Sequence, residues 1–295
     1  FLRVAPSDVG LVQGPTKRFA RVTIAMIQTI TSASFNCASD LERFGLVVVD
    51  ETHHLPARTF SQLMPHFKAK HVLGLSATLR RADGLSRAIY WQMGPLLCKI
   101  TRSRETSNMN FQLVETGVVV KEPRMYRAPD RVDWVRVTSN LAKNAARNQL
   151  LASVVSNLLQ AGRYVLVLSA LRKHLEELQS VIGMDGLLYV GETSKAGKRR
   201  RDDAFLEGPR LIFTTKAMCT EGFDWSVCDA VVFATPFSAN AALEQAVGRA
   251  QRSSARGLIV DLVDASPALK QLATKREAFF RSRGYSIFQE KKDMN

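Results

Sequence analysis

The chain has 295 residues, and its 41 lysines and arginines outnumber its 27 aspartates and glutamates to give a formal net charge of +14. Hydrophobic residues make up 46% and charged residues 23%, which is the balance of a globular protein and excludes intrinsic disorder, collagen and a small disulfide-held scaffold. So basic a chain favours a polyanionic partner, most often nucleic acid, over a basic protein without one. The four cysteines lack the spacing of metal ligands, and no apolar run is long enough to cross a membrane.

The predicted elements alternate between strands and helices. Short apolar runs predict buried parallel strands at residues 46–49, 72–75, 164–168, 211–213 and 230–233. Apolar residues between Leu141 and Leu159 recur at helical spacing, and Ala161 and Gly162 end that helix. The alternation predicts an α/β fold of doubly wound parallel sheets.

Residues 106–137 interrupt this rhythm with prolines, arginines and scattered polar residues. We interpret them as an interdomain connection that contains a short strand near residues 117–120. They would separate a first domain, residues 1–105, from a second domain, residues 138–288, which a polar tail at residues 289–295 follows.

The segment VVVDETHH, residues 47–54, carries the strongest chemical signal. An apolar strand ends in Asp50 and Glu51, and the carboxyl ends of strands are where open α/β sheets bind ligands. Nucleotide hydrolysis needs such a pair, one carboxylate to hold Mg²⁺ and the other to orient or deprotonate the attacking water. The alternative interpretation is an acidic pair that caps the following helix.

Three further segments place polar residues after a strand or on one helix face. They are Ser76, Ala77 and Thr78; Thr214 and Thr215 with Gly222 and Asp224 beyond them; and Gln245, Gly248, Arg249 and Arg252. Hydroxyl groups and arginines in such places suit contacts to phosphate. Each segment also has an ordinary interpretation, respectively a helix cap, a loop of turn residues and a solvated basic helix face.

In their order along the chain, the four segments resemble motifs II, III, V and VI of the superfamily 2 helicases and translocases, at residues 50–53, 76–78, 214–224 and 245–252. The resemblance implies two RecA-like lobes, the first incomplete at its N-terminus. It also implies an ATP-dependent DNA helicase or translocase that hydrolyses ATP between the lobes while it tracks the nucleic-acid backbone.

Smaller similarities agree with this family. Val22–Thr29 is similar to its T-x-Q segment, and Val165–Leu175 is similar to motif IV. Arg81–Gly84 and the stretch from Val260 to Tyr285 are similar to the XPB branch and to its phage, large-DNA-virus and poxvirus relatives.

The resemblance assigns roles to matching residues. Asp50 would hold Mg²⁺, and the catalytic residues would be Glu51, His53, Gln245, Arg249 and Arg252. Gly222, Asp224 and Gly248 would bind ATP, whereas Ser76, Ala77 and Thr78 would couple hydrolysis to movement of the lobes. The candidates for contacting one nucleic-acid strand are Gln28, Thr29, Arg172, His174, Thr214, Thr215 and Thr235. Some of these residues also have an ordinary structural interpretation. His174 is as readily a polar residue on a helix face, and the basic run Lys195–Arg201 is as readily a solvated turn.

The family's phosphate loop, G-x-x-x-x-G-K-[ST], does not occur in this sequence. The nearest segment, Gly191–Arg199, has five residues between its glycines and an arginine in place of the final serine or threonine. We therefore expect an N-terminally truncated core whose first sheet exposes apolar surface. We also expect the 295-residue chain alone to bind ATP weakly and to hydrolyse little of it.

Two other functions stay open, a non-catalytic helicase-like subunit that binds nucleic acid and an RNA helicase. The intact acidic pair together with Arg249 and Arg252 argues against the first, since a non-catalytic site has no need for these residues. Backbone contacts carry too little sequence information to separate DNA from RNA. We expect ATP and Mg²⁺ as cofactors, DNA as the partner, and proteins of transcription, repair or replication as further partners. The N-terminal residues lack the pattern of a signal peptide, so we expect an intracellular protein of the cytoplasm, nucleus or viral factory, neither secreted nor bound to a membrane.

Overall fold

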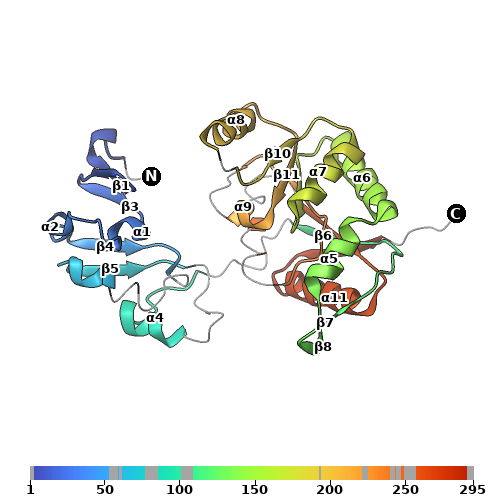
Figure 1. Cartoon of the computed structure of the whole chain (residues 1–295), viewed down its shortest axis with the longest axis horizontal. Helices are drawn as coiled ribbons and strands as arrows, with labels where there is room; N and C mark the ends of the chain where they lie inside the picture. Colours follow the sequence, from blue (N-terminus) through green and yellow to red (C-terminus); the bar gives the residue numbers. More distant parts are fainter. Residues whose placement is uncertain are drawn as a thin grey trace. The chain divides into compact units, whose positions relative to one another are not determined.

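The computed structural model forms two compact units, Phe1–Ile100 and Thr101–Asn295 (Figure 1). The structure describes residues 3–52, 59, 62–76, 86–100, 109–192, 194–220, 225–239, 243, 247–248 and 257–290. Within these ranges, none of the helices has the length and apolar character needed to cross a membrane.

The first unit contains two small sheets. Its elements are η1 (Pro6–Asp8), β1 (Val9–Gln13), β2 (Thr16–Arg18), β3 (Val22–Ala25), α1 (Ile27–Ile30), α2 (Ala38–Leu41), β4 (Leu46–Val49), η3 (Met64–His66), β5 (His71–Gly74) and α4 (Ser86–Met93). Strand β1 pairs antiparallel with β2 and parallel with β3, and β4 pairs parallel with β5. The parallel pair brings Val49 opposite Gly74, so both strands end at the same edge.

Apolar side chains of the first unit are divided between a small core and the surface. Val12, Leu41 and Leu63 are buried together. Ile24 and Leu46 are 59% and 55% exposed, although each lies on a strand. The first unit therefore carries the exposed apolar surface that we expected of its sheet.

The second unit is built on one parallel sheet of seven strands in the order β10-β11-β9-β12-β13-β6-β14. The strands are β6 (Asn110–Glu115), β9 (Val165–Ser169), β10 (Leu187–Tyr189), β11 (Leu211–Thr215), β12 (Ala230–Phe233), β13 (Leu258–Val263) and β14 (Ser286–Glu290). A separate hairpin joins β7 (Arg124–Met125) to β8 (Ala128–Val132). The helices are α5 (Trp134–Ala142), α6 (Ala145–Gln160), α7 (Arg172–Ile182), α8 (Lys195–Leu206), α9 (Lys216–Thr220) and α11 (Pro267–Ser282).

Alternate residues of each central strand point to opposite faces, and both faces are covered. Phe233 lies in a core with Phe280 of α11, whereas its neighbour Val232 lies in a second core with Leu151 of α6 and Leu175 of α7. Strands covered on both faces are the reason that this half of the sequence contains continuous apolar runs. The prediction of an α/β fold with a doubly wound parallel sheet is confirmed.

The five strands predicted from apolar runs are present to within two residues, but three other expectations need correction. Residues 106–137 are more than a connection, because β6 lies inside the seven-stranded sheet between β13 and β14. The short strand expected near residues 117–120 of that connection is absent, and the segment instead hydrogen-bonds to Ala265 and Ser266. The helix expected across residues 141–159 is divided, because Asn144 accepts a hydrogen bond from the Arg147 backbone N–H and so starts α6 anew.

The third correction concerns the basic run Lys195–Arg201, which we expected as a solvated turn. It is the first half of helix α8, and Ser194 caps that helix by accepting a hydrogen bond from the Gly197 N–H at 3.0 Å. Lys195, Lys198, Arg199 and Arg200 remain exposed, whereas Arg201 lies over the Tyr189 ring and donates to the Val190 carbonyl.

Candidate functional site

The acidic pair forms a strained turn directly after β4. Glu51 has φ +48°, in the left-handed region that non-glycine residues rarely adopt. Its backbone N–H donates a hydrogen bond of 2.8 Å to Asp50 Oδ1, which stabilises the turn. Asp50 and Glu51 directly follow Val49, the last residue of β4, so both carboxylates stand at the carboxyl end of the strand as the sequence predicts. The Asp50 side chain is exposed.

Thr52 ties this turn to the end of the neighbouring strand β5. Its hydroxyl oxygen lies 3.0 Å from the carbonyl oxygens of Val49 and Leu75, and its backbone N–H donates to Leu75 as well. Little space separates the two strand ends, because a Cβ on Gly74 would lie 2.9 Å from the Thr52 hydroxyl. Ser76 follows Leu75, so the structure brings this predicted coupling residue beside the acidic turn.

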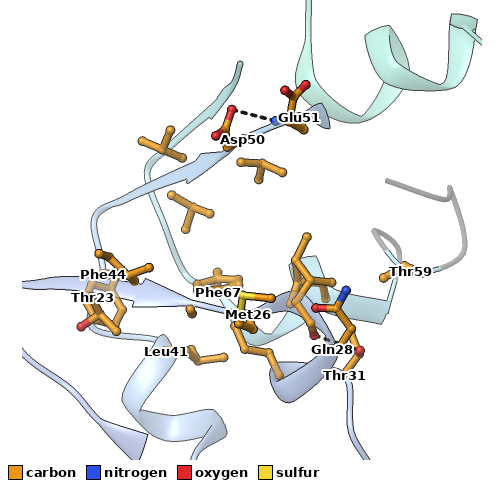
Figure 2. Close-up of a pocket in the computed structure, with 18 of the residues that line it drawn as sticks. Thr23, Met26, Gln28, Thr31, Leu41, Phe44, Asp50, Glu51, Thr59 and Phe67 are labelled. Carbon is orange, nitrogen blue, oxygen red and sulfur yellow. Dashed lines mark hydrogen bonds between the residues drawn. The ribbon is translucent and has the colours of Figure 1, made fainter. Parts of the chain in front are cut away.

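A cavity of about 830 Å³ opens between β3, α1 and β4 in the first unit. Asp50 and Glu51 lie at one end of it and Gln28 and Thr31 at the other, while the wall between them is mostly apolar (Figure 2). This volume falls within the range of ligand pockets in proteins. The cavity thus groups the acidic pair with Gln28, which we predicted as a nucleic-acid contact.

The acidic turn fits a magnesium ion better than it fits a metal that needs a protein cage. Among the described residues no group of three or more His, Cys, Asp or Glu side chains could hold a metal, and Asp50 Oδ2 has no hydrogen-bond partner. Mg²⁺ is commonly held by one or two carboxylates, with water and substrate phosphates as its other ligands. Asp50 at an exposed strand end offers that kind of partial ligand set.

The nucleic-acid candidates of the second unit fall into two groups. Arg172 is half exposed and Thr215 partly exposed, and both lie at the carboxyl edge of the sheet. His174, Thr214 and Thr235 are buried at 1% exposure or less, so direct contacts from these three to nucleic acid do not fit the structure. In the first unit, the Thr29 hydroxyl accepts a hydrogen bond from the Gly14 N–H and so supports a turn.

The three buried residues, His174, Thr214 and Thr235, instead form hydrogen bonds that hold neighbouring backbone or side-chain groups in place. Thr214 donates to the Tyr189 carbonyl, and the Thr235 hydroxyl accepts from the Ala170 N–H at 2.8 Å. Thr235 thereby links the end of β12 to the loop after β9. The sequence could not separate these roles, because a hydroxyl at a strand end serves either purpose.

His174 belongs to a buried polar chain. Its Nε2 lies 3.0 Å from Asn148 Oδ1, and its Nδ1 lies 3.1 Å from Ser169 Oγ. The amide NH₂ of Asn148 donates to the Ala142 carbonyl, so its oxygen faces the imidazole and Nε2 carries the proton. Burial, together with the nearby Arg147 guanidinium, lowers the pKa of His174 to about 4. The imidazole is therefore neutral at pH 7.

Two buried guanidinium groups hold the segment that follows β12. Arg147 of α6 pairs with Asp264 through Nε at 2.9 and 3.1 Å and donates through Nη1 to the Ala234 carbonyl. Arg276 of α11 pairs with Asp261 through Nε at 2.7 Å and through Nη2 at 3.1 Å.

The Arg276 guanidinium also contacts the chain beyond β12, because its Nη1 donates to the Phe237 carbonyl at 3.0 Å. The helices α6 and α11 cover opposite faces of the sheet, so Ala234 to Phe237 is held from both sides. That segment leads toward residues 245–252, predicted to contact ATP.

Several predicted site residues lie outside the described residues. These are His53, Ala77, Thr78, Gly222, Asp224, Gln245, Arg249 and Arg252. Gly248 is described within a short helical stretch beside Val247, which is buried in the core.

Sequence reasoning missed Thr52, Arg147 and Arg276, although the two arginines left a signal. Arg147 precedes the buried Leu151 and Val155 by four and eight residues, so it occupies the apolar face of its helix. Arg276 precedes the buried Phe280 by four residues in the same way. A charged residue on an apolar face predicts a buried ion pair, and Asp261 inside the apolar strand β13 is its counterpart.

Comparison with known proteins finds helicases among the relatives of this chain. Residues 2–81 match the family model described as the type III restriction enzyme, res subunit. Over 95% of its length the chain is 24% identical to L396 of Acanthamoeba polyphaga mimivirus, which carries an ATP-dependent RNA helicase name, and it covers 55% of that protein. It is 21% identical to helicase D10 of Escherichia phage T5, over 90% of this chain and 58% of that protein. It is 26% identical to the DNA 3'-5' helicase XPB of Mycobacterium tuberculosis, over 95% of this chain and 52% of that one.

Solved structures share the fold. Saccharomyces cerevisiae Dbp5 bound to RNA and ADP BeF3 aligns with 98% of this chain and 71% of its own at a TM-score of 0.63 and 12% identity. Mycobacterium smegmatis helicase Lhr bound to ssDNA and AMP-PNP aligns with 95% of this chain and 38% of its own at a TM-score of 0.60 and 19% identity. The chain spans about half the length of the curated relatives it matches.

Proposed function

Because the chain is homologous to helicases of viruses and phages and to XPB DNA helicases, we propose that it is part of an ATP-dependent DNA helicase or translocase. The observation that carries the proposal is the strained turn of Asp50 and Glu51 at the end of β4, fixed by Thr52 beside Ser76. A turn of this kind holds two carboxylates in a defined direction, which phosphoryl transfer requires and a solvated helix cap does not.

Within this proposal each residue has a role in hydrolysis. Asp50 offers an oxygen ligand to Mg²⁺, and the ion, when bound with ATP, neutralises charge on the phosphates. Glu51 accepts the proton of the attacking water. Thr52 positions Glu51 relative to Ser76, so displacement of either strand end alters the direction of the carboxylate. Arg249 and Arg252 supply positive charge to the γ-phosphate, in keeping with the family resemblance.

The nucleic-acid contacts in this proposal come from residues whose side chains reach the surface. Gln28 in the first unit and Arg172 and Thr215 in the second keep the contact role, whereas His174, Thr214 and Thr235 position loops. The net charge of +14 supplies the sequence-independent attraction to a phosphate backbone. DNA is the proposed partner, because the XPB relatives are DNA helicases by name.

The proposal is tested with the protein encoded by the longest reading frame that contains this chain. ATP hydrolysis is measured without nucleic acid and with single-stranded DNA, duplex DNA and RNA of matched sequence. We expect stimulation by DNA at low salt that weakens as salt rises. Stimulation by RNA alone would favour an RNA helicase, and binding of nucleic acid without hydrolysis would favour a non-catalytic subunit.

A further inference from the structure

The hairpin of β7 and β8 presents an aromatic side chain to solvent. Met125 pairs with Ala128, so Tyr126 and Arg127 form a two-residue turn at its tip. Tyr126 is 98% exposed, the highest exposure of any large hydrophobic residue in the described part of the chain. Figure 1 shows β7 and β8 at the margin of the second unit, beyond α5 and α11.

The residues of this turn are poor choices for turn formation. Two-residue hairpin turns favour asparagine, aspartate or glycine with positive φ, because that geometry matches the twist of the strands. Tyr126 and Arg127 have neither the residue type nor a positive φ. Places where a sequence departs from local preference without a gain in packing are often functional. Here the fully exposed tyrosine gains no packing.

Charge around the turn matches a polyanion. Arg124, Arg127 and Lys121 are exposed, and in the described part of the chain none of them forms an ion pair with a carboxylate. The Arg124 guanidinium donates a hydrogen bond to the Asp130 backbone carbonyl and so links the two strands of the hairpin. In the described part of the chain, the Arg127 side chain makes no such hydrogen bond. An exposed tyrosine beside unpaired arginines is the arrangement on which unpaired nucleic-acid bases stack.

The hairpin also stands on the appropriate side of the sheet. Strand β6 ends at Glu115, and the chain continues beyond that edge alongside residues 263–269. Ala265 donates to the Val118 carbonyl, and the carboxylate of Glu122 accepts from the backbone N–H groups at the start of α11. The hairpin follows directly. It therefore projects from the carboxyl edge, where Thr215 and Arg172 also lie and where parallel sheets bind ligands.

We propose that the β7–β8 hairpin is a single-strand contact, in which an unpaired base stacks on Tyr126 while Arg127 neutralises a neighbouring phosphate. This inference rests on the proposed function, since it presupposes a nucleic-acid substrate. It adds a contact that none of the predicted motifs contains. Stacking is independent of base identity, so the hairpin holds a strand without reading its sequence.

Binding of a fluorescent oligothymidine to the protein from the longest reading frame tests this contact. Anisotropy titrations at several salt concentrations compare wild type with Tyr126→Ala, Tyr126→Trp and Arg127→Ala, and Val181→Ala serves as a matched change of an exposed apolar residue on α7. Tyr126→Ala should weaken binding about tenfold without changing the salt dependence, because stacking releases no counterions. Tyr126→Trp should bind at least as tightly as wild type. Arg127→Ala should lower the slope of log K against log salt by about 0.7.

The outcomes separate this inference from the proposed function. Equal affinities for wild type, Tyr126→Ala and Arg127→Ala would overturn the hairpin contact, provided that wild type binds the oligonucleotide. An equal loss in Tyr126→Trp and Tyr126→Ala would also overturn it, since an aromatic ring would then not suffice. Failure of wild type to bind any nucleic acid would instead contradict the proposed function. Thermal unfolding of each variant shows whether the exposed substitution leaves the fold intact.

Discussion

Acidification should destabilise the second unit through His174. The pKa of this buried imidazole is about 4, below its ordinary value of 6.5, so the unfolded chain binds more protons between these two values. The stability that the neutral imidazole contributes is complete above pH 6.5 and falls as the pH drops toward 4. The difference between the two pKa values corresponds to a loss of about 3 kcal/mol, because one pKa unit is worth about 1.4 kcal/mol.

Urea denaturation at intervals between pH 7.5 and pH 4 measures this loss. Wild type is compared with His174→Gln, whose amide can still reach Asn148 or Ser169 but does not titrate. Contributions of all other groups cancel in the difference between the two proteins. The variant should be the less stable at pH 7.5, and its disadvantage should shrink by about 3 kcal/mol on acidification. Parallel stability curves over the whole range would refute the buried, neutral imidazole.

Three substitutions test the packing that positions the loops. Asp264→Ala should cost about 3–5 kcal/mol in urea unfolding, because it leaves the Arg147 charge buried and unpaired, whereas Asp203→Ala, which removes an exposed ion pair, should cost less than about 1 kcal/mol. Asn144→Ala removes the cap of α6 and should cost about 1 kcal/mol, with the loss visible in the thermal midpoint. Gly74→Ala should cost about 1–3 kcal/mol by crowding the hydroxyl of Thr52, and ordinary stability in that variant would contradict the close approach of the two strand ends.

The sequence predicts the sheet of the second unit well, because its central strands are apolar on both faces. It fails at β6, where Asn110, Gln112 and Glu115 dilute the apolar pattern. That strand is held by its partners β13 and β14, whose paired residues come 148 and 176 positions later in the chain, as Asn110 pairs with Leu258 and Ser286. No local pattern carries information over such a distance, so the sequence alone indicates a connection where the structure has a strand of the sheet.

In the candidate site, too, the sequence predicts some features and misses others. The position of Asp50 and Glu51 at the end of a strand is predictable because a continuous apolar run directly precedes them. The contact roles predicted for His174 and Thr235 do not fit the burial of these side chains, because the sequence cannot tell a buried hydroxyl or imidazole from an exposed one. Arg147 carried a usable signal, since its spacing to Leu151 places it on the apolar face of α6. A charge in such a position is best interpreted as half of a buried pair.

The most direct test of the central proposal is a comparison of ATP hydrolysis by wild type and Glu51→Gln, in the protein from the longest reading frame, with duplex DNA present. If Glu51 accepts the proton of the attacking water, the variant should lose at least about a hundredfold in kcat while it still binds ATP and DNA. Asp203→Ala serves as the control for an exposed carboxylate. Hydrolysis by Glu51→Gln at the wild-type rate would contradict the assignment of the acidic turn as the site of catalysis.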